Sequence, residues 1–207
     1  MPGPLAPVLR RCSVGKSVHL KDGTEVSIRP LTKEDLDKSL AFFQGLPEED
    51  RKYLRVDVSK RDVVERRIRQ IDSGRVERLV ALVNDEIVAD GALELAGHDW
   101  AAHVGELRLI VSHRFQRKGL GMVMARELYT IAAGQKLEQI VVSMARPQVA
   151  ARSIFRRLGF REEITLPGHV KDLSGSSQDL ILMRCDLKAL WQELETFFAH
   201  SDWQRTR

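Results

Sequence analysis

The sequence predicts one α/β (α+β) domain in which helices flank a mixed but mostly antiparallel sheet. Three consecutive strand patterns joined by short turns, at residues 78–83, 87–95 and 104–111, predict the antiparallel part of this sheet. Stretches with helical spacing precede and follow them. The chain has 207 residues, of which 43% are hydrophobic and 30% are charged, so it can bury one sizeable core.

The first elements are a strand and two helices. Residues 24–30 alternate apolar and polar side chains, which predicts a strand. Thr32, with Asp35 three residues later, is the pattern of a helix cap. The helix that follows has one apolar face, formed by Leu36, Leu40 and Phe43. A second helical pattern spans residues 62–73.

The second half of the chain alternates helices and strands. In order, we expect a helix at 119–134, a buried strand at 139–143, a helix at 147–159, a strand at 160–166, a loop at 167–178 and a last strand at 179–185. The domain itself is expected to span residues 22–187. Residues 1–21 have the composition of a flexible tail, and residues 188–207 suggest a helix that packs on the domain or on a partner.

The composition argues against several classes of protein. The net charge of +4 comes from basic residues mixed with 29 acidic ones, which does not indicate nucleic-acid binding, although the arginines of residues 146–161 leave that reading open. No apolar stretch suggests a membrane span or a signal peptide. Two distant cysteines and scattered histidines give no metal-type spacing. We therefore expect a cytoplasmic protein without a metal site, with an organelle transit segment in residues 1–21 as a weak alternative.

The most informative stretch is residues 109–121, which contain a buried strand, a basic loop and the start of a helix with two glycines. The first N–H groups of a helix have no partner inside it, and the helix dipole favours an anion there. Gly119 and Gly121 would let a diphosphate approach these amides, and Arg114, Arg117 and Lys118 would attract it. A helix start with solvated basic residues has the same local pattern.

Two other phosphate motifs do not fit. A dinucleotide fingerprint needs its first glycine directly after the strand and a third small residue where this chain has Met124. The segment Gly15-Lys16-Ser17 imitates the end of a P-loop, but Arg10 stands at the position of the required earlier glycine.

Residues 116–121, Gln-Arg-Lys-Gly-Leu-Gly, match the signature Gln/Arg-x-x-Gly-x-Gly/Ala, and the sequence here resembles the GNAT superfamily of N-acetyltransferases. A second family pattern is echoed, at the expected spacing, by Gln148, Ala151, Ile154, Phe155, Gly159 and Phe160. The resemblance implies a sheet of six to seven strands that splays between strands 4 and 5. The segments 28–35 and 43–50 look most like bacterial protein-lysine acetyltransferases.

The resemblance also implies the roles of individual residues around acetyl-CoA, the expected cosubstrate. The main chain of Leu109 and Val111, with Ile110 between them, would bind the pantetheine arm. The amides of Gln116, Arg117, Lys118, Gly119, Leu120 and Gly121 would bind the diphosphate. Gln148, Ala151 and Phe155 would complete the cofactor site, although Gln148 stands where the family has asparagine.

Glu106 is the candidate general base, because the resembling enzymes place a catalytic glutamate at this position. We expect an apolar cleft to raise its pKa; a glutamate that is solvated or paired with Arg108 is the alternative. Phe155 replaces the tyrosine that often protonates the departing thiolate, so the general acid is unassigned.

The expected activity is acetyl transfer from acetyl-CoA to a primary amine, with protein lysine slightly preferred to a small metabolite amine. A catalytically silent acyl-CoA sensor of the same fold is the alternative, and a homodimer is possible.

Overall fold

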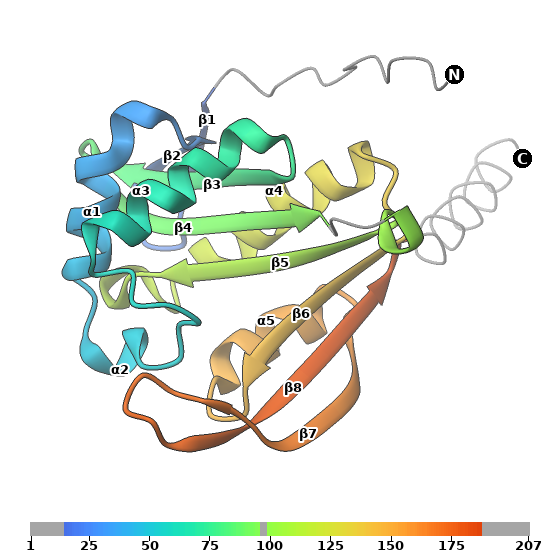
Figure 1. The fold of residues 1–207 in the computed structure, drawn as a ribbon. Helices are drawn as coiled ribbons and strands as arrows, with labels where there is room; N and C mark the ends of the chain where they lie inside the picture. The colour runs from blue at the N-terminus through green and yellow to red at the C-terminus, as the bar shows by residue number, and fades with distance from the viewer. Residues whose placement is uncertain (1–14, 96–98, 188–207) are drawn as a thin grey trace, which may run out of the picture.

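The computed structural model describes residues 15–95 and 99–187, which form one eight-stranded sheet covered by helices on both faces (Figure 1). The strand order is β1-β2-β3-β4-β5-β6-β8-β7. The strands are β1 (Lys16–His19), β2 (Glu25–Pro30), β3 (Val76–Val83), β4 (Glu86–Leu95), β5 (Val104–Val111), β6 (Gln139–Ala145), β7 (Arg161–Lys171) and β8 (Ser177–Asp186). The helices are α1 (Leu36–Gln44), α2 (Glu48–Arg51), α3 (Arg61–Arg69), α4 (Leu120–Gly134) and α5 (Val149–Arg157).

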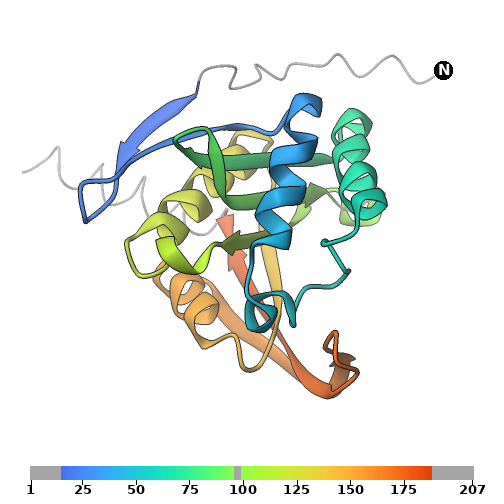
Figure 2. The same ribbon diagram turned by 90° about the vertical axis from the view of Figure 1, so that its left-hand side faces the viewer.

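Helices cover both faces of the sheet (Figure 2), and each face carries a separate apolar core. Helices α1 and α3 cover one face, where Phe43, Val64 and Val80 are almost fully buried. Helices α4 and α5 lie on the opposite face, where Leu120 and Leu128 are buried. Of the apolar face predicted for the first helix, Phe43 is buried, and Leu36 and Leu40 are partly buried against the same core. No described helix is both long and apolar enough to cross a membrane.

The predicted antiparallel meander is confirmed in β3, β4 and β5, and the expected splay is also present. Strands β5 and β6 run parallel but pair only where residues 104–106 face residues 139–141. Beyond Glu106 the two strands diverge, and Figure 1 shows the V-shaped gap between them. Strands β5 and β6 correspond to the fourth and fifth expected strands, because the expected strands begin with residues 24–30 and do not include β1.

Strand β1 was not expected, and it is the reason that the sheet has eight strands rather than six or seven. Helix α2 was not expected either. Strand β1 lies within residues 1–21, predicted as a flexible tail, and pairs with β2 from Lys16↔Ile28 to His19↔Glu25. It is only four residues long and three of them are polar, so its sequence carries little periodicity. The expected tail residues 1–14 and the expected helix at 188–207 lie outside the described residues.

The predicted loop at 167–178 is wrong over most of its length, because β7 and β8 extend into it. The pairing of β7 with β8 shifts register between Leu166 and Val170. Pro167 and Gly168 lie in this irregularity, and they interrupt the strand pattern in the sequence. The actual turn is residues 172–176, where Asp172 accepts hydrogen bonds from the Ser174 and Ser176 amides.

Candidate active site

The open edge of β5 is the first component of the site. Ser112 N–H donates to Val88 O at 2.9 Å, which marks these two as a hydrogen-bonded pair of the β4–β5 ladder. Such pairs alternate along an antiparallel ladder, so the main chain of Ile110 also faces β4. The main-chain groups of Leu109 and Val111 then point the other way, into the gap that opens toward β6. This is the orientation expected for contacts with a pantetheine arm.

The loop between β5 and α4 forms the second component. Arg117 and Gly119 both have positive φ angles, of 60° and 97°. Gly119 is the N-cap of α4, and no side chain of the described residues caps this helix. The amides of Leu120 and Gly121 belong to the first turn, whose N–H groups have no partner within the helix. This arrangement fits the predicted diphosphate site.

Gly121 has a packing role that differs from the expected one. A Cβ atom at this position would lie 2.9 Å from Ile154 Cδ1 of α5 and 3.7 Å from Val111 Cγ2. The absence of a side chain therefore permits close contact between α4 and α5, rather than the approach of a ligand. The same position places the end of β5 next to the start of α4.

The turn between β1 and β2 packs against the loop between β5 and α4, residues 112–119, which we call the phosphate loop. Lys21 N–H donates to Lys118 O at 3.2 Å, and the Lys21 side chain passes 3.8 Å from the Cβ position of Gly119. Lys118 Nζ lies 2.9 Å from Asp22 Oδ2, and this hydrogen bond lowers the pKa of Asp22 to about 2. Part of the positive charge of Lys118 is thus already compensated, and Lys21 is a cation that the sequence-based site did not include.

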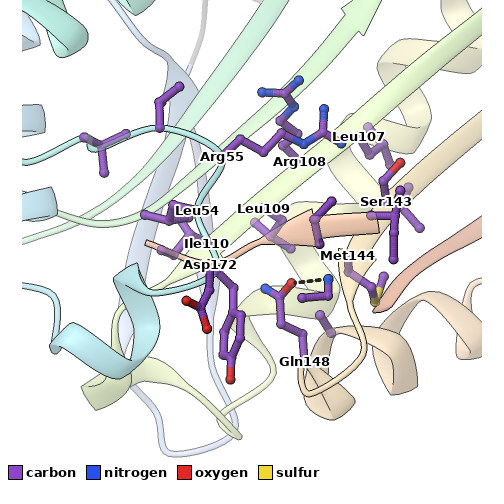
Figure 3. Close-up of a pocket in the computed structure, with 18 of the residues that line it drawn as sticks. Leu54, Arg55, Leu107, Arg108, Leu109, Ile110, Ser143, Met144, Gln148 and Asp172 are labelled. Atoms are coloured by element: carbon purple, nitrogen blue, oxygen red, sulfur yellow. Dashed lines mark hydrogen bonds between the residues drawn. The ribbon is translucent and has the colours of Figure 1, made fainter. Parts of the chain in front are cut away.

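Gln116 and Gln148 both use their side chains to fix the main chain. Gln116 Nε2 donates to Val111 O at 3.1 Å, which ties the phosphate loop to the end of β5. Gln148 Oε1 accepts from Ala145 N–H at 2.9 Å and joins the end of β6 to the start of α5 (Figure 3). The amide nitrogen of Gln148 is not used in this hydrogen bond and can donate to a ligand.

A cavity of about 370 Å³ occupies the gap between β5 and β6 (Figure 3). Its lining includes five of the predicted cofactor residues: Leu109, Ile110, Gln148, Ala151 and Phe155. Val111, at the end of β5, and residues 116–121, which lead into α4, are not part of this lining. Phe155 is buried and packs edge-on against Phe160, with ring centroids 5.1 Å apart.

Two segments distant in sequence enclose the open end of the gap. Leu173 N–H, in the turn between β7 and β8, donates to Lys52 O at 2.9 Å. Lys52 Nζ also lies 3.4 Å from Asp172 Oδ2. The residues after α2, from Tyr53 to Val58, then continue along the cavity wall. This wall of the cavity is therefore built by the loop that follows α2 and by the β7–β8 turn.

Glu106 lies at the point where β5 and β6 separate, and its environment differs from the expected apolar cleft. The Arg55 guanidinium donates to both carboxylate oxygens, and Arg108 Nη2 lies 3.7 Å from Oε2. Burial raises the pKa of Glu106, but the hydrogen bond from Arg55 and the charges of both arginines outweigh it, so the pKa lies below its ordinary value. The expectation of a raised pKa is wrong, and pairing with Arg108 is only part of the reason.

Arg55 and Ser143 belong to the surroundings of Glu106, and neither was predicted. Ser143 on β6 hydrogen-bonds to the Glu106 carboxylate, and Arg55 comes from a loop 51 residues earlier in the chain. Both residues line the cavity, whereas Glu106 is not among its lining residues in the described part of the chain. No local motif marks them, because only the strand divergence and the α2–α3 loop bring them to this point.

Comparisons with known proteins agree with this geometry. Residues 75–162 match the family model described as the acetyltransferase (GNAT) domain. A search of curated proteins found no match. Among solved structures, the ribosomal-protein-alanine N-acetyltransferase from Brucella melitensis is 21% identical, with a TM-score of 0.68 over 77% of this chain and 99% of that one.

Two further structures are similar in the same way. The GNAT domain of S. lividans PAT is 16% identical, with a TM-score of 0.70 over 84% of this chain and 97% of that one. A putative acetyltransferase from Salmonella typhimurium, solved with its cofactor acetyl-CoA, is 18% identical, with a TM-score of 0.69 over 79% and 94% of the two chains. At these identities the likeness establishes the fold.

The matched segment runs from just before β3 to the start of β7, so it contains both the open edge of β5 and the start of α4. This segment is therefore similar to the acetyltransferase (GNAT) domain, a class of enzyme whose acetyl donor is acetyl-CoA.

Proposed function

We propose that the protein transfers the acetyl group of acetyl-CoA to a primary amine by direct attack within the gap between β5 and β6. The observation that carries this proposal is the outward-facing main chain of Leu109 and Val111, which adjoins a cavity on one side and the start of α4 on the other. A ligand with an extended arm and a diphosphate would contact both. Val111 N–H is the candidate donor to the thioester oxygen.

Glu106 is the proposed general base. A lysine-type amine has a pKa near 10.4, so only about one molecule in a thousand is neutral near pH 7 and a proton acceptor is useful. The paired arginines keep the Glu106 carboxylate ionised, and Ser143 fixes its orientation. The nitrogen attacks the thioester carbon, the carbon–sulfur bond breaks, and the amine proton passes to Glu106 directly or through water. Solvent reprotonates the thiolate, because Phe155 carries no acidic proton.

The resemblance to bacterial protein-lysine acetyltransferases favours a protein lysine as acceptor, with a small metabolite amine as the alternative. The predicted division at residues 1–21, 22–187 and 188–207 is part of this proposal, with residues 16–19 joined to the domain as β1. A cytoplasmic location, a possible homodimer and the absence of a nucleic-acid partner also remain predictions. Cell fractionation, light scattering and salt-dependent binding assays test them in turn.

The decisive experiment compares the wild-type protein with Glu106→Gln, using thiol release from acetyl-CoA with a panel of amines and lysine peptides. We expect the variant to lose turnover about 10²-fold or more while its affinity for CoA is retained. Glu65→Gln, at an exposed ion pair on α3, is the matched control and should keep full turnover.

Two results would contradict the proposal in different ways. Equal turnover by Glu106→Gln would remove the base role from this residue. A wild-type protein that binds CoA but releases no thiol with any amine would instead support the alternative of a catalytically silent acyl-CoA sensor.

A further inference from the structure

Four arginines gather on the α1/α3 face of the sheet, beside the cavity. This arginine cluster consists of Arg55, Arg67, Arg78 and Arg108. Three of its members, all except Arg78, line the cavity itself. Figure 3 places Arg55 and Arg108 at the same end of the cavity, away from Gln148 and Asp172. The cluster comes from the α2–α3 loop, α3, β3 and β5, so the assembled fold is needed to form it.

The carboxylates that contact the arginine cluster are fewer than the arginines. Asp90 Oδ1 accepts from Arg67 at 3.0 Å and from Arg78 at 2.7 Å. Glu94 lies 2.7 Å from Arg108, and Glu106 is shared between Arg55 and Arg108. Within residues 15–95 and 99–187, four cations thus meet three anions, which leaves one excess positive charge.

Two of these arginines have pKa values below the ordinary value, mainly because they are buried. Burial lowers the pKa of Arg67, and the nearby charges of Arg78 and Arg108 lower it further against the opposing effect of Asp90. Burial likewise lowers the pKa of Arg108, with a further contribution from Arg55. An additional anion at this end of the cavity would relieve the repulsion among the four side chains.

The pairing of Arg55 with Glu106 restricts which amine can react. An acceptor amine that reaches Glu106 must displace Arg55 from the carboxylate. An amine with no other charge would leave Arg55 without its anion, next to three further arginines, and Arg55 would have to turn out toward solvent. An acceptor with both an ammonium and a carboxylate replaces both halves of the ion pair at once.

We propose that the acceptor is a primary amine with a carboxylate close to the amine, as in a free amino acid, and that Arg55 binds this carboxylate while Glu106 receives the amine. This inference rests on the proposed function and narrows its acceptor class. It selects the small metabolite amine over the protein lysine, because a lysine side chain has no carboxylate beside its amine. The apolar wall formed by Phe43, Leu54 and Val58 would contact the rest of the acceptor.

The test uses the full chain and pairs of acceptors that differ only in the carboxylate: α-, β- and γ-amino acids and their amides, with lysine peptides alongside. The readout is thiol release from acetyl-CoA, analysed as separate kcat and KM values. We expect at least one acid to exceed its amide about tenfold or more in kcat/KM. The amine of an α-amide is the weaker base and is more often neutral, so the comparison for α-amino acids is biased against this result.

The variant Arg55→Gln should have different effects on kcat/KM for the acid and for the amide. It should lower kcat/KM for the preferred acid about tenfold to a hundredfold, mainly through KM, because the carboxylate loses its partner. The amide should react as well as before or better, because Arg55 no longer competes for Glu106. Arg61→Gln removes the same charge from an exposed ion pair at the start of α3 and should change neither acceptor.

Three outcomes would overturn the inference. Amides that match their acids in the wild-type protein would show that the carboxylate is not recognised, and so would turnover confined to lysine peptides. A preference for acids that survives in Arg55→Gln would assign recognition elsewhere. Absence of thiol release with every amine in the panel would overturn the proposed function as well, and this result is distinct from turnover without a preference.

Discussion

Gly119 occupies a main-chain conformation that few other residues adopt. Its φ of 97° places the N-cap of α4 in the left-handed region, directly before the amides proposed to bind the diphosphate. A side chain here would bring strain of about 1–2 kcal/mol. The space beside its Cβ position holds only the Lys21 side chain, at 3.8 Å, so the conformation rather than crowding requires glycine.

Gly119→Ala is therefore expected to weaken CoA binding about tenfold, because the loop relaxes away from the geometry that aligns the amides. Gly134→Ala is the matched control within the same helix, since Gly134 has neither a positive φ nor a neighbour within 4 Å of its Cβ position. Competition with a fluorescent CoA analogue measures both affinities. Equal loss in the two variants would point to a general effect on α4 rather than on the loop.

Glu106 illustrates how far the sequence could predict a single residue. Its position in the strand before the phosphate loop was sufficient to single it out, but its pKa depends on Arg55, which lies 51 residues away. Sequence spacing carries no information about such a partner, so even the direction of the pKa shift was predicted wrongly. The roles of Leu109 and Val111 came from the family resemblance, and their main chain faces away from β4, as contact with a pantetheine arm requires.

At the scale of elements, the helix cap before α1 is a sequence pattern that contributes to the stability of the fold. The expected pattern of Thr32 and Asp35 is present as a capping box, and Asp35 also accepts two hydrogen bonds from Arg29, at 2.6 and 2.7 Å. These bonds from Arg29 are the main reason that the pKa of the buried Asp35 falls from 3.8 to about 2. The ion pair between Arg29 and Asp35 thus connects β2 to the residue directly before α1.

Asp35→Asn should lower the free energy of unfolding at pH 7 by about 2 kcal/mol. Because the folded pKa of Asp35 is depressed, its contribution is fully present above about pH 4 and is lost as the pH falls through about 2. Urea unfolding between pH 7 and pH 3 should show the difference between variant and wild type shrinking in the acid range. Asp37→Asn, at an exposed pair with Arg61, should change stability by less than about 0.5 kcal/mol. A difference for Asp35→Asn that is constant with pH would contradict the role of the charge.

Elements with sustained periodicity were predicted well, and short or interrupted ones were not. The helix from Leu120 and strands β3 to β5 follow the spacing of their apolar residues. Strand β1 has four residues, and β7 contains a proline within a register shift, so both give a weak local signal. In these two cases the partner strand supplies the order that the segment itself does not encode.

At the scale of the whole molecule, function depends on one topological feature. The sheet continues past the point where β5 and β6 stop pairing, because β8 pairs with β6 along its length and β7 completes that edge. The position of β8 between β6 and β7 could not be read from local patterns. The family resemblance predicted the splay, and the structure adds what encloses it: the α2–α3 loop and the β7–β8 turn.

A crystal structure of the full chain with CoA tests the central claim most directly. The account predicts that the diphosphate accepts hydrogen bonds from main-chain amides between Gln116 and Gly121. It also predicts that the pantetheine arm runs along the Leu109–Val111 edge, with its sulfur directed toward Glu106. A CoA molecule bound elsewhere, or a gap between β5 and β6 filled by side chains in the presence of saturating CoA, would contradict it.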